Sequence, residues 1–181
     1  NEAIGYTGAT HLLEHLMFKG SKNYNKKLGN SIDTLEHLGG YLNATTWNDR
    51  TNYYAVVPKQ HLATALAMEA DRMRGAFIDE EDRQAEMTVV RNEFERGENE
   101  AISALHKGIW STAYKAHPYH HDTIGWLSDI ENVPIERLKA FYNEFYWPNN
   151  ATLSLFGDFD HQQALDQVAD IFGHIPASTH Q

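Results

Sequence analysis

The chain contains no cysteine in its 181 residues. This absence excludes disulfide bonds and thiolate metal ligands, so any bound metal ion must be held by histidine, aspartate or glutamate. Cations are also scarce, because 15 lysines and arginines stand against 25 aspartates and glutamates, for a formal net charge of −10. Nucleic acids and anionic membrane surfaces require clustered lysine and arginine, so we expect neither as a partner.

Long hydrophobic runs are missing as well. No apolar stretch approaches the roughly 20 residues of a membrane-spanning helix, so no membrane span is expected. The sequence opens at Asn1 with neither a methionine nor a secretory signal pattern, and it therefore looks like an excised or processed piece. Its length and its hydrophobic content of 41% fit one domain with a buried core, which we expect over residues 1–175, followed by a tail or linker at 176–181.

Hydrophobic periodicity predicts an α+β fold. The expected helices cover residues 8–19, 31–38, 60–76, 80–102 (with a break before a continuation to 114), 134–145 and 160–172. Two β-like runs, residues 41–46 and 51–57, flank a polar turn and predict a hairpin, and residues 151–156 are typical of a short strand. Helices mixed with a few strands indicate an antiparallel-rich sheet covered by helices.

The most informative motif is His11-Leu12-Leu13-Glu14-His15. Residues four apart lie on one face of a helix, so both imidazoles can reach one metal ion. Glu14 borders that face and is placed to act on a metal-bound water rather than to bind the metal. This order is the reverse of the His-Glu-x-x-His pattern found in many zinc peptidases. A five-residue pattern can arise by chance, so it needs support elsewhere in the chain.

A catalytic zinc site needs a third protein ligand, and the best candidate lies on the predicted helix over 80–102. Glu86 and Glu93 are two turns apart and share a face with Val89 and Val90, so the glutamates are expected to flank a buried stripe. Buried carboxylates are unfavourable unless they are paired or bind a metal. Glu93 as ligand and Glu86 as the group that orients a histidine is therefore one interpretation. Taken by themselves, the two glutamates are more typical of a solvated pair of charges.

Further segments of the sequence resemble a known family. Five ordered blocks carry the resemblance: the motif with Leu16-Met17-Phe18-Lys19-Gly20 after it, Gly39-Gly40-Tyr41-Leu42-Asn43-Ala44 with Thr51-x-Tyr53-Tyr54, Glu86 with Glu93, His117-Pro118-Tyr119 with Gly125, and Trp147-Pro148-Asn149-Asn150-Ala151 with Gly157-Asp158-Phe159. In this order they resemble the N-terminal catalytic domain of the pitrilysin/insulinase family of zinc metallopeptidases, which includes the mitochondrial processing peptidases.

The resemblance implies a complete catalytic centre. His11, His15 and Glu93 would bind one zinc ion per domain, Glu14 would act as general base, and Glu86 would support the site. It also implies that family members carry two strands ahead of the motif helix and complete the active site with a second, C-terminal half. This chain has neither, so it would be an N-terminally truncated fragment that binds zinc and is a poor peptidase alone.

The family also implies a substrate and partners. Asn43, Ala44 and Thr45 would bind an extended peptide or unfolded polypeptide through main-chain hydrogen bonds. A second homologous half or subunit would close the chamber. We therefore expect a zinc-dependent endopeptidase domain, located in the bacterial periplasm or envelope, with the mitochondrial matrix as the alternative. Two other functions stay open: an inactive partner or structural subunit of the same fold, and a zinc hydrolase with a non-peptide substrate.

Overall fold

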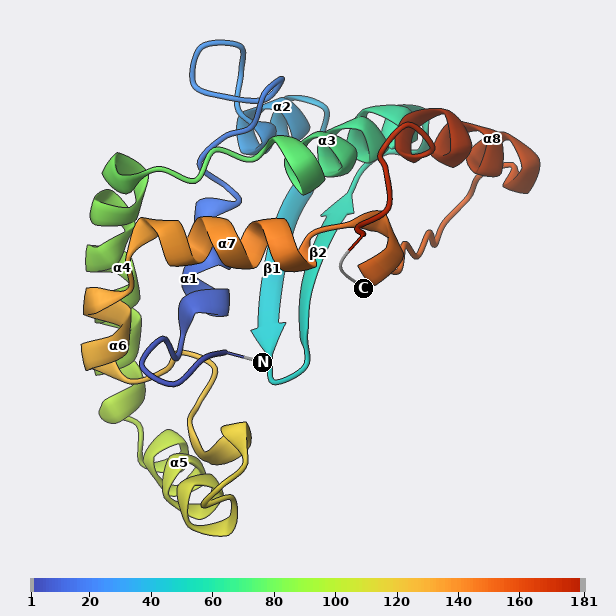
Figure 1. Cartoon of the computed structure of the whole chain (residues 1–181). Helices are drawn as coiled ribbons and strands as arrows, with labels where there is room; N and C mark the ends of the chain where they lie inside the picture. Colours follow the sequence, from blue (N-terminus) through green and yellow to red (C-terminus); the bar gives the residue numbers. More distant parts are fainter. Residues whose placement is uncertain (1, 180–181) are drawn as a thin grey trace. The chain divides into compact units, whose positions relative to one another are not determined.

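The computed structural model describes residues 2–179 (Figure 1). Asn1, at which the sequence opens, and the last two positions of the predicted tail, His180 and Gln181, lie outside the described residues. The chain divides into two compact units. The first comprises Asn1–Leu16, Ala44–Asn52 and Ile78–Lys139, and the second comprises Met17–Asn43, Tyr53–Phe77 and Ala140–Gln181. A single domain over residues 1–175 stays a prediction.

The first unit is built from helices. They are α1 (Ala9–Leu16), α4 (Glu80–Glu98), α5 (Ala101–Ala113), the 3-10 turn η2 (Pro118–His120) and α6 (Leu127–Asn132). Helix α4 is the central element, because it packs against α1, α5 and α6 (Figure 1). The side chains buried most completely in this unit are all apolar: Leu12, Leu13, Leu16, Val90, Ile130, Val133 and Leu138.

The second unit has its own packed elements. They are α2 (Ser31–His37), η1 (Lys59–His61), α3 (Leu62–Gly75), η3 (Pro148–Asn150) and α8 (His161–Phe172). Helix α3 packs against α8. Its Arg72 is 3% exposed, because the guanidinium lies over the rings of Phe18 and Tyr53 and pairs with the Glu69 carboxylate. Cation–π contacts and this ion pair compensate for the burial of the charge.

Three elements contain residues of both units: β1 (Tyr41–Trp47), β2 (Arg50–Val56) and α7 (Ile135–Phe145). The two strands form a two-stranded antiparallel sheet, which confirms the predicted hairpin. Burial alternates along β1, with Leu42, Ala44 and Thr46 on the more buried face. This alternation follows from the two-residue repeat of an extended strand.

Most predicted helices are confirmed within a few residues, with three exceptions. The motif helix ends at Leu16 rather than at residue 19, the long helix breaks after Glu98 and resumes at Ala101, and α6 was not predicted. The strand predicted over residues 151–156 is wrong. In the described chain these residues have no strand partner and are largely exposed, and an extended segment needs a neighbouring strand to satisfy its backbone groups.

Within residues 2–179, no helix combines the length and the apolar character that crossing a membrane requires.

Candidate metal centre

Helix α1 carries the motif, and the helix is firmly anchored in its unit. Leu12, Leu13 and Leu16 are fully buried. Their packing fixes the rotation of the helix about its axis, and therefore the direction in which the motif side chains on the opposite side project. The Glu2 carboxylate accepts hydrogen bonds from the backbone N–H groups of Gly8 (2.9 Å) and Thr10 (2.7 Å), which satisfies donors in the first turn. A carboxylate there also interacts favourably with the helix dipole.

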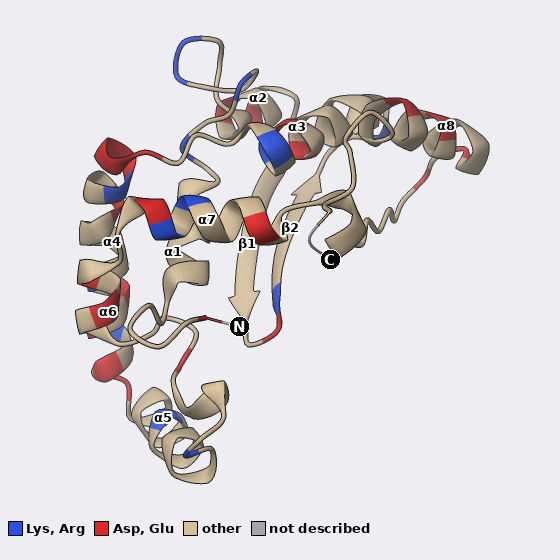
Figure 2. Ribbon diagram, in the orientation of Figure 1, with Lys and Arg blue, Asp and Glu red and all other residues tan. Residues whose placement is uncertain are grey.

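Helix α4 presents the two glutamates. Asp79 caps it by accepting a hydrogen bond from the backbone N–H of Asp82 at 2.9 Å, and acidic residues fill its first turn (Figure 2). Glu86 and Val90 are buried, as predicted, whereas 45% of the Glu93 side chain and 43% of Val89 are exposed. The expectation that the whole stripe is buried was therefore wrong for Val89 and Glu93.

Three side chains bring a donor atom to one point. His11 Nε2 lies 3.3 Å from His15 Nε2, and Glu93 Oε2 lies 3.6 Å from the first nitrogen and 3.5 Å from the second. Ligand atoms held about 2.0–2.1 Å from a tetrahedral zinc ion are about 3.3–3.4 Å apart. The three separations thus approximate one face of a zinc tetrahedron, and two imidazoles with one carboxylate form a donor set that suits a catalytic zinc site.

Glu86 orients one of these histidines. Its Oε1 lies 2.9 Å from His15 Nδ1, and its side chain is 10% exposed. A carboxylate accepts hydrogen bonds only, so this contact assigns the ring proton to Nδ1 and leaves Nε2 of His15 as an electron-pair donor toward the triangle. Carboxylate, histidine and metal in this order are a recurrent arrangement around zinc.

The electrostatics favour a neutral His11. Burial, reinforced by the nearby His15, lowers the pKa of His11 from 6.5 to about 4, although Asp122 opposes the shift. Only neutral imidazole can bind a metal ion, so this side chain is ready to do so at neutral pH. Its Nδ1 is buried and has no hydrogen-bond partner among the described residues.

Glu14 lies outside the donor triangle. Its side chain is buried, and one carboxylate oxygen, Oε2, accepts a hydrogen bond from the Thr46 hydroxyl of β1. Burial raises the pKa of the Glu14 carboxyl group, while the Thr46 hydrogen bond opposes that shift. A carboxylate with a raised pKa is a stronger base than an exposed one, as general-base catalysis requires.

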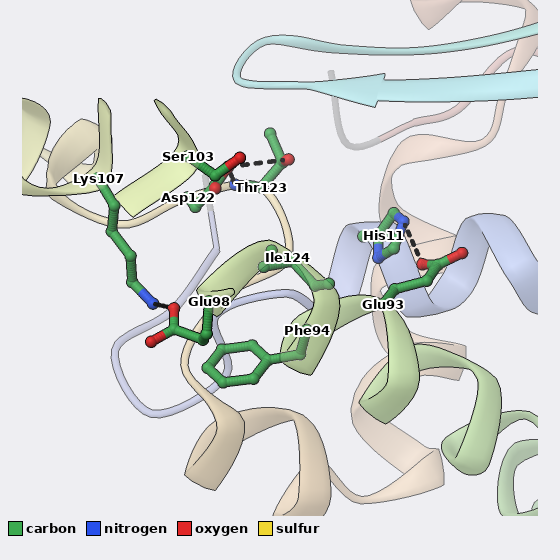
Figure 3. A pocket seen from close by; sticks show the side chains of 10 residues that line it. His11, Glu93, Phe94, Glu98, Ser103, Lys107, Asp122, Thr123 and Ile124 are labelled. Carbon is green, nitrogen blue, oxygen red and sulfur yellow. Dashed lines mark hydrogen bonds and ion pairs between the residues drawn. The ribbon is translucent and has the colours of Figure 1, made fainter. Parts of the chain in front are cut away.

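A pocket adjoins the donor triangle (Figure 3). His11 and Glu93 line one end, and Glu98 and Lys107 line the other. The Lys107 ammonium pairs with Glu98 at 2.5 Å and lies 4.8 Å from the centre of the Phe94 ring. Glu98 and Phe94 thus keep the Lys107 ammonium at the wall of the pocket. A molecule bound in the pocket would lie next to the donor atoms of His11 and Glu93.

Sequence reasoning missed part of this arrangement. It named Asn43, Ala44 and Thr45 on β1, where the structure buries Ala44 and exposes the other two. It did not single out Thr46, although strand alternation places that hydroxyl on the face of Ala44 and could have drawn attention to it. No local pattern links Lys107 to the motif, because α5 is placed at the pocket by its packing against α4 and η2.

Two family models match the chain. Residues 1–125 match the model described as insulinase (peptidase family M16), and residues 132–181 match the model of the peptidase M16 inactive domain.

Relatives share sequence over most of the chain. The zinc protease PqqE of Helicobacter pylori is 34% identical over 92% of this chain and 37% of that protein. A probable mitochondrial-processing peptidase subunit beta of Schizosaccharomyces pombe is 30% identical over 99% of this chain and 39% of that protein. The chain therefore spans about two fifths of the length of these relatives.

Solved structures share the fold. A protease from Helicobacter pylori gives a TM-score of 0.92 at 31% identity, covering 100% of this chain and 44% of that one. The periplasmic protease PqqL from Escherichia coli gives a TM-score of 0.85 at 28% identity, covering 99% of this chain and 20% of that one. These likenesses confirm the predicted fold class and the resemblance read from the motifs.

Proposed function

The chain belongs to the insulinase family of peptidases, peptidase family M16, and we propose that it is a zinc-dependent endopeptidase domain of a longer protein. The observation that carries the proposal is the triangle of His11 Nε2, His15 Nε2 and Glu93 Oε2, whose sides measure 3.3–3.6 Å. Its dimensions support one zinc ion per domain, and a relative named as a zinc protease supports the same metal.

Two further carboxylates have separate roles: Glu14 transfers protons, and Glu86 orients a metal-binding histidine. A zinc ion in this site supplies Lewis-acid polarisation of a peptide carbonyl and lowers the pKa of water. The Glu14 carboxylate takes the proton of the attacking water at Oε1, because Oε2 accepts the Thr46 hydrogen bond, and returns that proton to the leaving amine. Glu86 holds His15 in the tautomer and orientation that the site needs.

The substrate is proposed to be a peptide or an unfolded polypeptide that binds along β1. Asn43, Ala44 and Thr45 immediately precede Thr46, whose hydroxyl reaches Glu14, so a peptide paired with this stretch runs past the general base. Main-chain pairing gives affinity with little dependence on sequence. The pocket bordered by His11 and Lys107 then receives a side chain close to the bond that is cleaved.

A second candidate is a catalytically inactive partner of the same fold. The observation that favours it is the match of residues 132–181 to a model named for an inactive domain. Members that lose the chemistry are expected to lose motif residues, whereas His11, Glu14, His15 and Glu93 are all present. This makes the peptidase the stronger of the two candidates.

The partner and the compartment are proposals as well. The relatives are more than twice as long as this chain, and one related structure is named the first half of a periplasmic protease. Both observations support a second half or subunit that completes the active site. Relatives named as periplasmic and as mitochondrial support the two locations that the sequence predicted.

The test uses the full-length protein. We expect about one zinc ion per molecule, cleavage of a quenched fluorescent peptide, and loss of zinc when His11 and His15 are both changed to alanine. Glu14→Gln should retain zinc and lose cleavage, because the amide cannot accept the proton.

Each other result has a definite meaning. Zinc that survives the double histidine substitution contradicts the donor assignment. Loss of zinc in Glu14→Gln would make Glu14 a ligand instead of a base. A wild-type protein that binds zinc and cleaves no peptide supports the inactive partner.

A further inference from the structure

The buried carboxylate of Glu14 has a specific donor on the neighbouring strand. The Thr46 hydroxyl donates a hydrogen bond to Glu14 Oε2, across 32 positions of sequence. Both residues belong to the first compact unit. A hydroxyl carries only one hydrogen, so the Thr46 hydroxyl that donates to Glu14 cannot donate to any other group, although its oxygen can still accept a hydrogen bond.

The position of Thr46 makes this hydroxyl unusual. It lies with Leu42 and Ala44 on the more buried face of β1, where an apolar β-branched side chain such as valine would fit the same space. Threonine and valine have nearly the same shape, but only threonine brings a polar group that needs a partner. The Glu14 carboxylate accepts the hydrogen bond of this hydroxyl, and the hydroxyl in turn gives the buried carboxylate a donor.

A second hydroxyl supports the first. Thr51 on β2 has its Oγ1 3.3 Å from Thr46 Oγ1. Since the Thr46 hydrogen points to Glu14, Thr51 is the donor in this pair. The two hydroxyls and the carboxylate thus form a chain of hydrogen bonds with one direction, and such chains strengthen their members.

We propose that Thr46 is a positioning residue that holds the Glu14 carboxylate in the orientation required of a general base. This inference rests on the function proposed above for Glu14. Anchoring Oε2 on the strand restricts rotation of the carboxylate and directs Oε1 toward the water. Thr51 acts through Thr46 and contributes less.

The main test is Thr46→Val in the full-length protein. The substitution keeps the shape and removes the donor, so we expect kcat to fall about 10- to 100-fold, the range of one hydrogen bond to a charged group. KM and zinc content should change little, because the Thr46 hydroxyl donates to Glu14 and its oxygen is not one of the three donor atoms of the triangle. Thr46→Ser should restore most of kcat, and Thr51→Val should lower kcat only a few-fold.

A readout independent of turnover completes the test. In zinc-free protein, Thr46→Val and Glu14→Ala should shift the midpoint of thermal unfolding non-additively, since each removes one partner of the same hydrogen bond. Thr88→Val, at an exposed position of α4, is the control and should leave kcat unchanged.

The outcomes separate the two proposals. If wild-type protein cleaves and Glu14→Gln does not, an unchanged kcat in Thr46→Val overturns the positioning role alone. Failure of serine to restore kcat, loss of zinc in Thr46→Val, or additive midpoint shifts also overturns it. If Glu14→Gln cleaves as fast as wild type, the base assignment fails and the positioning role fails with it.

Discussion

Removing the Glu86 carboxylate should weaken zinc binding without touching a metal ligand. The Glu86 Oε1 contact to His15 Nδ1, at 2.9 Å and largely shielded from water, keeps the other ring nitrogen directed at the donor triangle. Loss of a group that orients a metal-binding histidine weakens metal affinity about 10- to 100-fold. That range corresponds to about 1.4–2.7 kcal/mol.

Two substitutions at Glu86 should weaken zinc binding by amounts at the two ends of this range. In Glu86→Gln the side-chain carbonyl can still accept the His15 proton, so the lost charge alone should weaken binding by about 10-fold. Glu86→Ala removes the acceptor and leaves a buried gap, so its effect should approach about 100-fold. Competition with a chromogenic chelator measures both zinc dissociation constants, and Glu95→Gln, at an exposed position of α4, is the matched control.

Thermal unfolding gives an independent measure of the same quantity. Zinc in excess stabilises the folded protein in proportion to the logarithm of its affinity, so zinc-dependent stabilisation should shrink by about 1.4 kcal/mol for each tenfold loss. Wild-type zinc affinity in Glu86→Ala would refute the reasoning. So would an equal loss of affinity in Glu95→Gln, because the effect would then reflect the total charge of the helix.

Three further pairs of substitutions test the scaffold, each by urea unfolding. Asp79→Ala should destabilise by about 0.5–2 kcal/mol through loss of the α4 cap, and Asp79→Asn should not; equal effects would contradict the capping role. Gly8 has φ +82°, and an added Cβ would lie 2.2 Å from the Ile124 carbonyl oxygen. Gly8→Ala should therefore cost clearly more than the about 1–2 kcal/mol of Gly5→Ala, where φ is +85° and the space is open. Leu12→Ala should cost about 2–5 kcal/mol and Leu12→Met less than about 1.5 kcal/mol; similar values would argue against tight packing.

The metal centre shows how far local sequence reasoning reaches. The spacing of His11 and His15 identified two donors on one face, because the helical repeat is a property of the backbone. The same repeat grouped Glu86 with Glu93 but could not tell a metal-site pair from solvated charges. Burial separates the two glutamates: Glu86 is enclosed, and Glu93 stays partly exposed at the rim of the pocket.

The fold shows the same division. Helices and the hairpin followed from periodicity, capping residues and turn residues, all of which act within a few positions. The segment at 151–156 has the composition of a strand and is not one here, since pairing with a second segment is a tertiary property. The break between α4 and α5 begins at Asn99, whose backbone N–H bonds to carbonyl groups of the last turn of α4, and periodicity alone did not give this position.

Two contacts at the centre of the proposals had no local signature. His15 meets Glu86 across 71 positions, and Thr46 meets Glu14 across 32, and neither distance follows from a helix or strand repeat. The sequence was sufficient for the residue types, their helical register and the family, because those depend on short-range spacing and ordered motifs. Which carboxylate orients a histidine, and which hydroxyl holds the general base, depended on the packing of α1 against α4 and on the face of β1 that Thr46 occupies.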